Sequence, residues 1–155
     1  AKEKGIHTCL DTSAGVYNPD SHEKIDEALK YTDLVMLDIK HIDSAAHKEL
    51  TGIGNERVLA FAQHLCDLGI PIVVPGITDD ENELFSLGKK LAEYKNLKAL
   101  DILPYHDMAK PKYENLGIPY PLGDTPPLTK QEAIRAKEIV IRGIKEGLKN
   151  ESANS

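Results

Sequence analysis

The sequence predicts an α/β fold of four βα units in a partial parallel barrel, that is, an incomplete TIM-like barrel. Short apolar runs alternate four times with amphipathic helical stretches. The runs are almost continuously apolar, which is typical of parallel strands that are covered on both faces. The 155 residues, 41% of them hydrophobic, suffice for one domain with a real core. We assign residues 1–149 to the partial barrel and 150–155 to a disordered tail; four units without a closing partner also fit an open sheet.

The first unit combines a strand over residues 6–10 with a helix that follows a turn at 18–20. His7 lies inside this strand and is expected to be a hydrogen-bonded core residue. Asp20 and Glu23 have the spacing of a capping box, which predicts the start of the helix. The helix has one apolar stripe, made of Ile25, Ala28 and Leu29.

The second unit begins with the strand 34–40, which ends in an acid and a base two residues apart. Period-two alternation places Val35, Leu37 and Ile39 on one face. It places Met36, Asp38 and Lys40 on the other. A helical turn at 44–50 is expected to stop at two glycines. A helix then runs from Asn55 to Gly69, with an apolar face of Val58, Leu59, Ala62, Leu65 and Cys66.

The last two units repeat the pattern. A strand at 70–74 is closed by Pro75-Gly76, and Thr78 with Glu81 predicts a capped helix. A strand at 97–103 precedes residues 107–128, a segment with five prolines and no periodicity, and loops of that length in compact domains are usually functional or disordered. The inward residues of the third helix are Leu84, Leu87, Leu91 and Tyr94. The last helix is expected to begin with a capping box of Thr129 and Glu132 and to bury Ala133, Ala136, Val140 and Ile144.

Charge and composition exclude several kinds of partner. The net charge of −6 argues against nucleic acid or an anionic membrane held by a basic field. No apolar run approaches the roughly 18 residues of a membrane span, and no signal peptide is recognisable. Cys9 and Cys66 have no metal or redox spacing, so we expect free thiols and a cytoplasmic location.

Polar residues follow the predicted strands at their carboxyl ends, where ligands bind in parallel α/β folds. Asp38 and Lys40 could clamp a zwitterion, or they could form a structural ion pair. Asp11 and Thr12 could cap a loop or join the same site. His106 could contact a ligand, act as a base or pack by hydrogen bonding. Met36 could pack in the core or place its thioether beside a ligand.

Four segments in order carry a family resemblance: His-Thr-Cys-Leu-Asp-Thr-Ser at 7–13, Leu-Val-Met-Leu-Asp-Ile-Lys at 34–40, Val-Pro-Gly at 74–76 and Leu-Pro-Tyr-His at 103–106. The chain resembles the C-terminal part of the pyruvate formate-lyase activating enzymes, which are radical S-adenosylmethionine proteins. The resemblance implies an oxidoreductase of anaerobic metabolism that cleaves S-adenosylmethionine reductively and abstracts a glycine hydrogen. The implied partners are a glycyl-radical enzyme such as pyruvate formate-lyase and an electron donor of the flavodoxin or ferredoxin type.

The resemblance also implies roles for residues of this chain. Its cofactor-binding residues would be Asp38, Ile39, Lys40 and His106, which match positions that contact S-adenosylmethionine. Its possible monovalent cation ligands would be Asp11, Thr12, Met36 and Asp38. Such a cation makes electrostatic sense, because two acids and a cofactor carboxylate would otherwise repel one another.

The chain departs from the family in its metal ligands. The family holds a 4Fe-4S cluster with a CxxxCxxC loop, whereas this chain has two cysteines and neither lies in that pattern. The Gly-Gly-Glu segment that holds the cofactor amino group is absent, and so is an Arg shortly before Val-Pro-Gly. Ala109 stands where relatives usually have Gly. We therefore expect no catalytic residues in this chain and no activity from it alone.

Two other functions are consistent with the residues. A non-catalytic α/β module could bind a partner peptide through the loop at 107–128. An unrelated α/β hydrolase or lyase could use Asp11, Asp38 and Lys40 around a metal, although no matched ligand set for a divalent metal is present.

Overall fold

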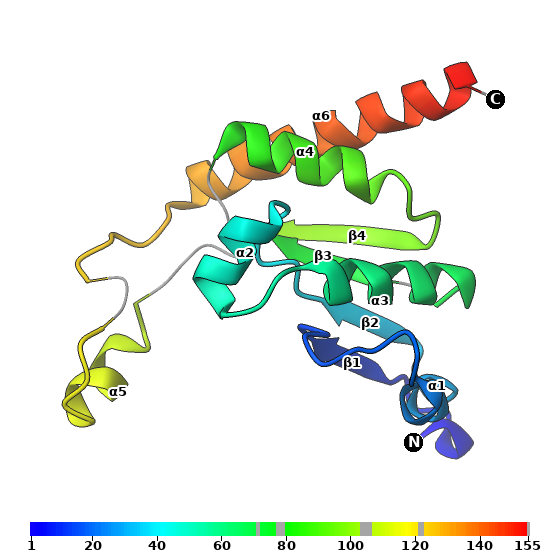
Figure 1. The fold of residues 1–155 in the computed structure, drawn as a ribbon, viewed down its shortest axis with the longest axis horizontal. Coiled ribbons are helices and arrows are strands. Elements are labelled where there is room, and N and C mark those ends of the chain that lie inside the picture. Colours follow the sequence, from blue (N-terminus) through cyan, green and yellow to red (C-terminus); the bar gives the residue numbers. More distant parts are fainter. Residues whose placement is uncertain (71, 77–79, 103–106, 121–122, 155) are drawn as a thin grey trace.

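The computed structural model describes residues 1–70, 72–76, 80–102, 107–120 and 123–154 (Figure 1). Within them, a parallel sheet has the strand order β1-β2-β3-β4. The strands are β1 (Cys9–Thr12), β2 (Leu34–Leu37), β3 (Ile72–Gly76) and β4 (Leu97–Ile102). The helices are the short 3-10 helix η1 (Lys2–Lys4), α1 (Glu23–Leu29), α2 (Ser44–Thr51), α3 (Glu56–Asp67), α4 (Glu81–Leu91), α5 (Lys110–Asn115) and α6 (Lys130–Asn154). The predicted α/β class is confirmed.

One face of the sheet packs against helices and the other is open. Parallel strands that advance in one direction place their right-handed crossovers on a single face. The covered face buries Val35, Leu37, Leu100 and Ile102, whereas Cys9, Asp11, Ala99 and Asp101 are exposed on β1 and β4. The expectation that both faces are covered is therefore wrong for the described residues. Apolar runs signal burial, but they do not tell how many faces are buried.

The first βα unit differs most from its prediction. β1 begins at Cys9 rather than at residue 6, and His7 precedes it and is exposed, so His7 is not a core residue. Helix α1 begins after His22, and no side chain caps it. Asp20 does not cap the helix; it lies before His22 in a local turn, where its backbone N–H donates to Asn18 Oδ1.

Helices α2, α3, α4 and α6 lie where the sequence predicts helices, although the cap of α4 differs. Helix α5 forms within residues 107–128, so the expectation of a loop without regular structure is wrong there. α2 ends at Gly52, which has a φ of 85°, a conformation that glycine adopts without strain. α3 starts after Asn55, as predicted. The cap of α4 is Asp80, whose carboxylate accepts from the N–H groups of Asn82 and Glu83. The predicted capping residue, Thr78, lies outside the described residues.

Helix α6 begins with the predicted capping box. Glu132 accepts hydrogen bonds from the Thr129 N–H at 2.8 Å and from its hydroxyl at 2.6 Å, and the Glu132 N–H donates back to Thr129 Oγ1. The helix continues to Asn154, so residues 150–154 extend it past Lys149. It lies alongside α4 (Figure 1).

The hydrophobic core lies between the covered face and the helices. Its fully buried members come from β2, β3 and the inward faces of α3, α4 and α6. They include Val35, Leu37, Ile72, Val58, Leu65, Leu84, Leu87, Leu91 and Val140. Burial of these aliphatic side chains, each contributing about 1.5–3 kcal/mol, holds β2 in the sheet and thereby positions the polar residues that follow it.

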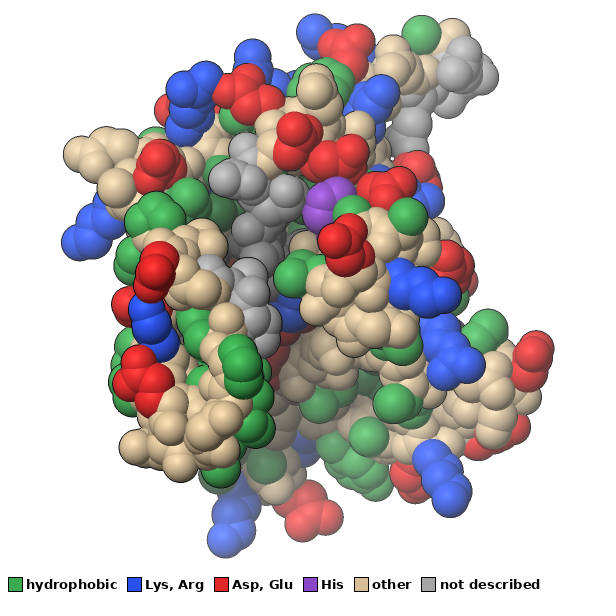
Figure 2. Space-filling view, turned by 60° about the vertical axis from the view of Figure 1, so that its left-hand side comes forward, with side chains coloured by type: hydrophobic (Ala, Val, Ile, Leu, Met, Phe, Trp, Pro, Cys, Tyr) green, Lys and Arg blue, Asp and Glu red, His purple; other side chains and the backbone are tan. Residues whose placement is uncertain are grey.

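Acidic and basic side chains are interspersed over the face shown in Figure 2, without a large patch of one sign. This distribution gives no basic field for a polyanion on that face. Among the described residues, none of the helices has the length and hydrophobicity needed to cross a bilayer.

Asp33 ties the segment before β1 to the start of β2, and this makes a testable prediction. Its carboxylate accepts from Lys2 Nζ at 2.8 Å, the Thr8 N–H at 2.9 Å and the Thr8 hydroxyl at 3.0 Å. The Lys2 ammonium first, and then Thr8, hold the pKa of Asp33 well below its ordinary 3.8. An acid with a lowered folded pKa stabilises the fold fully above its unfolded pKa, and this contribution is lost as the pH falls towards the folded pKa.

We therefore expect Asp33→Asn to destabilise the chain at about pH 7 and to have a clearly smaller effect at about pH 2. Denaturant midpoints of both proteins at the two pH values measure this. Glu27→Gln, at an exposed acid on α1, is the control. An equal loss of stability at both pH values would contradict the electrostatic explanation.

Candidate functional site

The carboxyl end of β2 presents the acid and the base singled out in the sequence. β2 ends at Leu37, so Asp38, Ile39 and Lys40 follow the strand instead of belonging to it. The alternation nevertheless continues through them. Ile39 is 1% exposed, in line with buried Leu37, while Asp38 and Lys40 are partly exposed. The predicted division of the residues of this stretch between two faces is confirmed.

Asp38 and Lys40 form an ion pair. Lys40 Nζ lies 2.7 Å from Asp38 Oδ2, and their side chains are 28% and 23% exposed, respectively. A pair with this much solvent contact adds about 1 kcal/mol or less to stability. The two groups therefore compensate each other in the unliganded chain. They can also part at little cost, so that the ammonium binds a carboxylate and the carboxylate binds an ammonium.

The end of β1 lies beside this pair. The parallel register places Asp11 next to Met36 and Thr12 next to Leu37, and the Asp38 N–H donates to the Thr12 carbonyl at 3.0 Å. Asp11, Met36 and Asp38 thus share the open face. Thr12 is in line with Leu37 on the covered face, and its hydroxyl accepts from the Ala14 N–H at 3.0 Å. The strands bring together three of the four residues predicted for a cation.

The remaining predicted residue, His106, lies outside the described residues. The Val-Pro-Gly backbone at 74–76 forms the carboxyl end of β3, at the same edge of the sheet as the end of β2. The position of the imidazole relative to Asp38 and Lys40 stays a prediction.

A buried asparagine positions the chain after Lys40. Asn55 is 3% exposed, and its Nδ2 donates to the carbonyls of His41 at 3.1 Å and Ile42 at 2.5 Å. The sequence indicated Asn55 only as the start of a helix. Its side chain does not cap that helix but holds the preceding loop. Nothing in the local sequence distinguishes these two roles.

Three further histidines have specific partners, and one of them is buried. His47 is 2% exposed, and its Nδ1 contacts the Ile53 carbonyl oxygen at 2.7 Å. His22 and His64 both contact Asp26, although 38 residues separate Asp26 from His64. The spacing of His22 and Asp26, four apart, was a signal in the sequence; the approach of His64 depends on the fold.

The cysteines do not fit an iron–sulfur cluster. Such clusters need three or four thiolates at one place. Cys9 is exposed on β1 and Cys66 is partly buried in α3, and these are the two cysteines of the chain. The donor set at the end of β2, in contrast, fits a zwitterionic headgroup.

Comparisons with curated proteins identify close relatives. A pyruvate formate-lyase-activating enzyme of Staphylococcus epidermidis is 45% identical over 133 residues, which are 81% of this chain and 53% of that protein. The protein of the same name in Streptococcus mutans is 44% identical over 147 residues, 90% of this chain and 56% of the relative. The protein of that name in Staphylococcus aureus is 42% identical over 142 residues, which are 87% of this chain and 56% of the relative. The chain thus spans just over half the length of these relatives.

A solved structure has the same fold. A domain of a pyruvate-formate lyase-activating enzyme from Bacteroides vulgatus superposes with a TM-score of 0.70, covering 92% of this chain and 80% of that one. Their sequence identity is 18%, so this likeness establishes the fold alone. No protein-family model matches the chain. The resemblance predicted from the four segments is confirmed by the curated relatives.

Proposed function

This chain is a homologue of the pyruvate formate-lyase-activating enzymes over most of its length, and on that premise we propose that it is part of a glycyl-radical-enzyme activating protein. The identity of 42–45% to three such enzymes carries the proposal. The full-length protein cleaves S-adenosylmethionine reductively and abstracts a hydrogen from a glycine of its partner enzyme. This makes it an oxidoreductase of anaerobic metabolism.

The role of this chain is to bind and orient S-adenosylmethionine. Lys40 binds the carboxylate of the methionyl group, and Asp38 balances the charge of Lys40 until the ligand arrives. The backbone around buried Ile39 fixes both side chains. Their 2.7 Å ion pair on the open face supports this role. His106 contacts the same ligand, and a monovalent cation lies among Asp11, Met36 and Asp38 on the open face, without the Thr12 side chain, which lies on the covered face.

The open face of the sheet is the inner face of a partial barrel. Its exposed residues on β1 and β4 support this, because an isolated α/β domain would cover them. The two cysteines of this chain do not fit a 4Fe-4S cluster. The cluster is therefore held by another part of the full-length protein. The chain alone is therefore inactive.

The remaining partners follow from the same premise. The enzyme that is activated is a glycyl-radical enzyme such as pyruvate formate-lyase, and the electron comes from a flavodoxin or ferredoxin. Both proteins act in the cytoplasm, where we place this protein too.

Lys40→Ala tests the proposed role most directly. We expect full-length protein, reconstituted anaerobically, to bind S-adenosylmethionine, and Lys40→Ala to weaken binding about tenfold or more, since a charge-assisted hydrogen bond is worth at least about 1.5 kcal/mol. Calorimetry measures both affinities. Lys30→Ala, at an exposed lysine after α1, is the control and should bind as wild type does. Equal affinity of the Lys40 variant and the wild type would remove Lys40 from the site.

A second candidate function is a non-catalytic module that docks a peptide through residues 107–128. Hydrophobic side chains on this segment favour it: Met108 is 74% exposed, Leu116 71% and Ile118 51%. The segment with α5 also extends away from the sheet (Figure 1). If this were the whole function, the protein would bind no S-adenosylmethionine in the same calorimetric experiment.

A further inference from the structure

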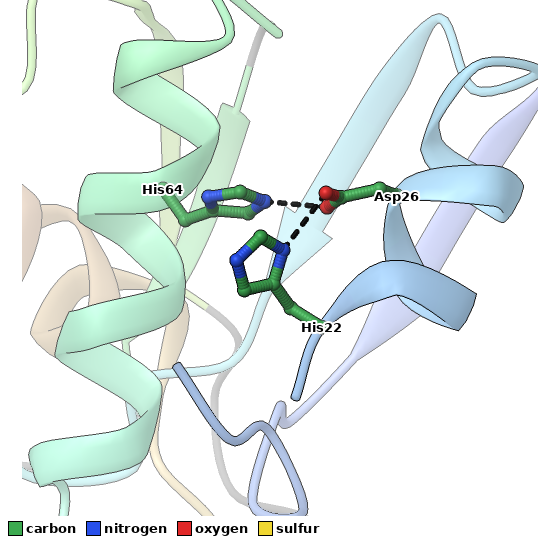
Figure 3. Close-up of side chains that lie close together, drawn as sticks. All are labelled: His22, Asp26 and His64. Carbon is green, nitrogen blue, oxygen red and sulfur yellow. Dashed lines mark hydrogen bonds and ion pairs between the residues drawn. The ribbon is translucent and has the colours of Figure 1, made fainter. Parts of the chain in front are cut away.

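Two helices of the covered face bring a carboxylate between two imidazoles. His22 immediately precedes α1, Asp26 lies in the middle of α1, and His64 lies in α3 (Figure 3). His22 Nδ1 donates to Asp26 Oδ2 at 2.8 Å, and His64 Nε2 donates to Asp26 Oδ1 at 2.6 Å. One nitrogen of each ring thus faces the same carboxylate.

The surroundings hold these rings in place. The His22 and His64 ring centroids are 4.7 Å apart, and the ring of Tyr17 lies 5.7 Å from that of His64. Tyr17 itself is 3% exposed and lies 5.0 Å from Phe61. The cluster therefore packs against the buried rings of Tyr17 and Phe61. This packing restricts its side chains, so they lose less conformational entropy when they bind a ligand.

The cluster is still open to solvent. The side chains of His22 and Asp26 are 35% and 32% exposed, and that of His64 is 16% exposed. A metal ion can therefore reach the three side chains from water.

Two imidazole nitrogens and one carboxylate oxygen are the donor set of an open zinc site. Zn²⁺ binds such ligands at about 2.0–2.2 Å in a tetrahedron, so its ligand atoms lie roughly 3.4 Å apart. The three ligand atoms here all lie within 4.8 Å of one another, so small side-chain rotations suffice. Within the part of the chain that the structure describes, this is the one group of three or more histidine, cysteine or acidic residues with that geometry.

We propose that His22, Asp26 and His64 bind a divalent transition-metal ion of the zinc class, which joins α1 to α3 and keeps water as its fourth ligand. On binding, each imidazole presents the lone pair of the nitrogen that faces Asp26 and carries its proton on the other nitrogen. The ion replaces two hydrogen bonds by three coordinate bonds across the helix pair. The site is separate from the Asp38–Lys40 pair and does not depend on the proposed function.

Titration of the metal-free 155-residue chain with Zn²⁺ alone tests this site. We expect one ion per chain, and a rise in the melting temperature because the folded state binds it. His64→Gln and His22→Asn keep an N–H donor near the original nitrogen but lose the metal ligand. Each should weaken binding about tenfold or more and remove the rise in melting temperature. His7→Gln, at an exposed histidine outside the cluster, should change neither.

Imidazole nitrogen resonances of the unaltered chain give a second measurement that needs no variant. Zn²⁺ should shift the Nδ1 resonance of His22 and the Nε2 resonance of His64, and leave those of His7 in place. Binding of wild-type strength in both cluster variants would overturn the proposal. So would a chain that binds no Zn²⁺, or one whose His22 and His64 resonances do not move on binding.

Discussion

Replacing Gly143 with valine is expected to destabilise the chain by about 3 kcal/mol, because α4 and α6 touch there through their backbones. A Cβ on Gly143 would overlap the Phe85 carbonyl oxygen and lie 2.9 Å from Gly88 Cα. A Cβ on Gly88 would in turn overlap the Val140 carbonyl oxygen. Neither carbonyl can rotate away while both helices remain intact, so the helices must separate. Denaturant unfolding followed by circular dichroism measures the loss of unfolding free energy. The dependence of this free energy on denaturant concentration should stay the same in the variant.

Arg142→Val is the matched control, because it places the same β-branched residue on the exposed side of α6, one position away. It should cost no more than about 0.5 kcal/mol through helix propensity. Glycine inside a helix normally costs up to about 1 kcal/mol relative to alanine, so Gly143→Val without the contact would be slightly stabilising. A variant as stable as the wild type would show that the two helices do not approach so closely.

The sequence predicts well whatever depends on local pattern. The alternation along 34–40 and the Thr129–Glu132 capping box were predicted correctly, because period and cap spacing are properties of neighbouring residues. The start of β1 was predicted three residues early. An apolar residue next to a strand looks the same as one inside it, and pairing with Leu34 begins only at Cys9.

The part of the candidate site that depends on the pattern of neighbouring residues could be predicted, and the part that depends on packing between helices could not. The parallel sheet brings Asp11 and Met36 side by side at the predicted edge, and Asp38 and Lys40 follow on the same stretch. The convergence of His22 and His64 on Asp26 was missed, because it needs two helices to pack in one register. The role of Gly143 was missed for the same reason. In the sequence, a glycine that a neighbouring helix requires cannot be told from one that merely destabilises its own helix.

Asn55→Asp is expected to destabilise the chain by about 3 kcal/mol while changing the side-chain volume very little. The buried amide donates to two carbonyls, those of His41 and Ile42, and a carboxylate can donate to neither. Both carbonyls lose this partner, and a negative charge faces their oxygens in a position that is 3% exposed. Because these carbonyls directly follow Lys40, the loop that positions the ammonium should loosen as well. Denaturant unfolding measures the stability, and calorimetry with S-adenosylmethionine on the full-length protein measures the loosening.

The same substitution at an exposed asparagine of α6, Asn150→Asp, is the control and should stay within about 0.5 kcal/mol of the wild type. Measuring the stability at acidic pH distinguishes the effect of the introduced charge and the lost hydrogen bonds from a general packing defect. Protonation gives the introduced carboxyl group one O–H donor and removes its charge, so the difference between Asn55→Asp and the wild type should shrink at about pH 4. A variant that unfolds at the wild-type denaturant concentration would mean that the loop after Lys40 is held by other contacts. A difference that stays constant with pH would exclude the buried charge as its cause.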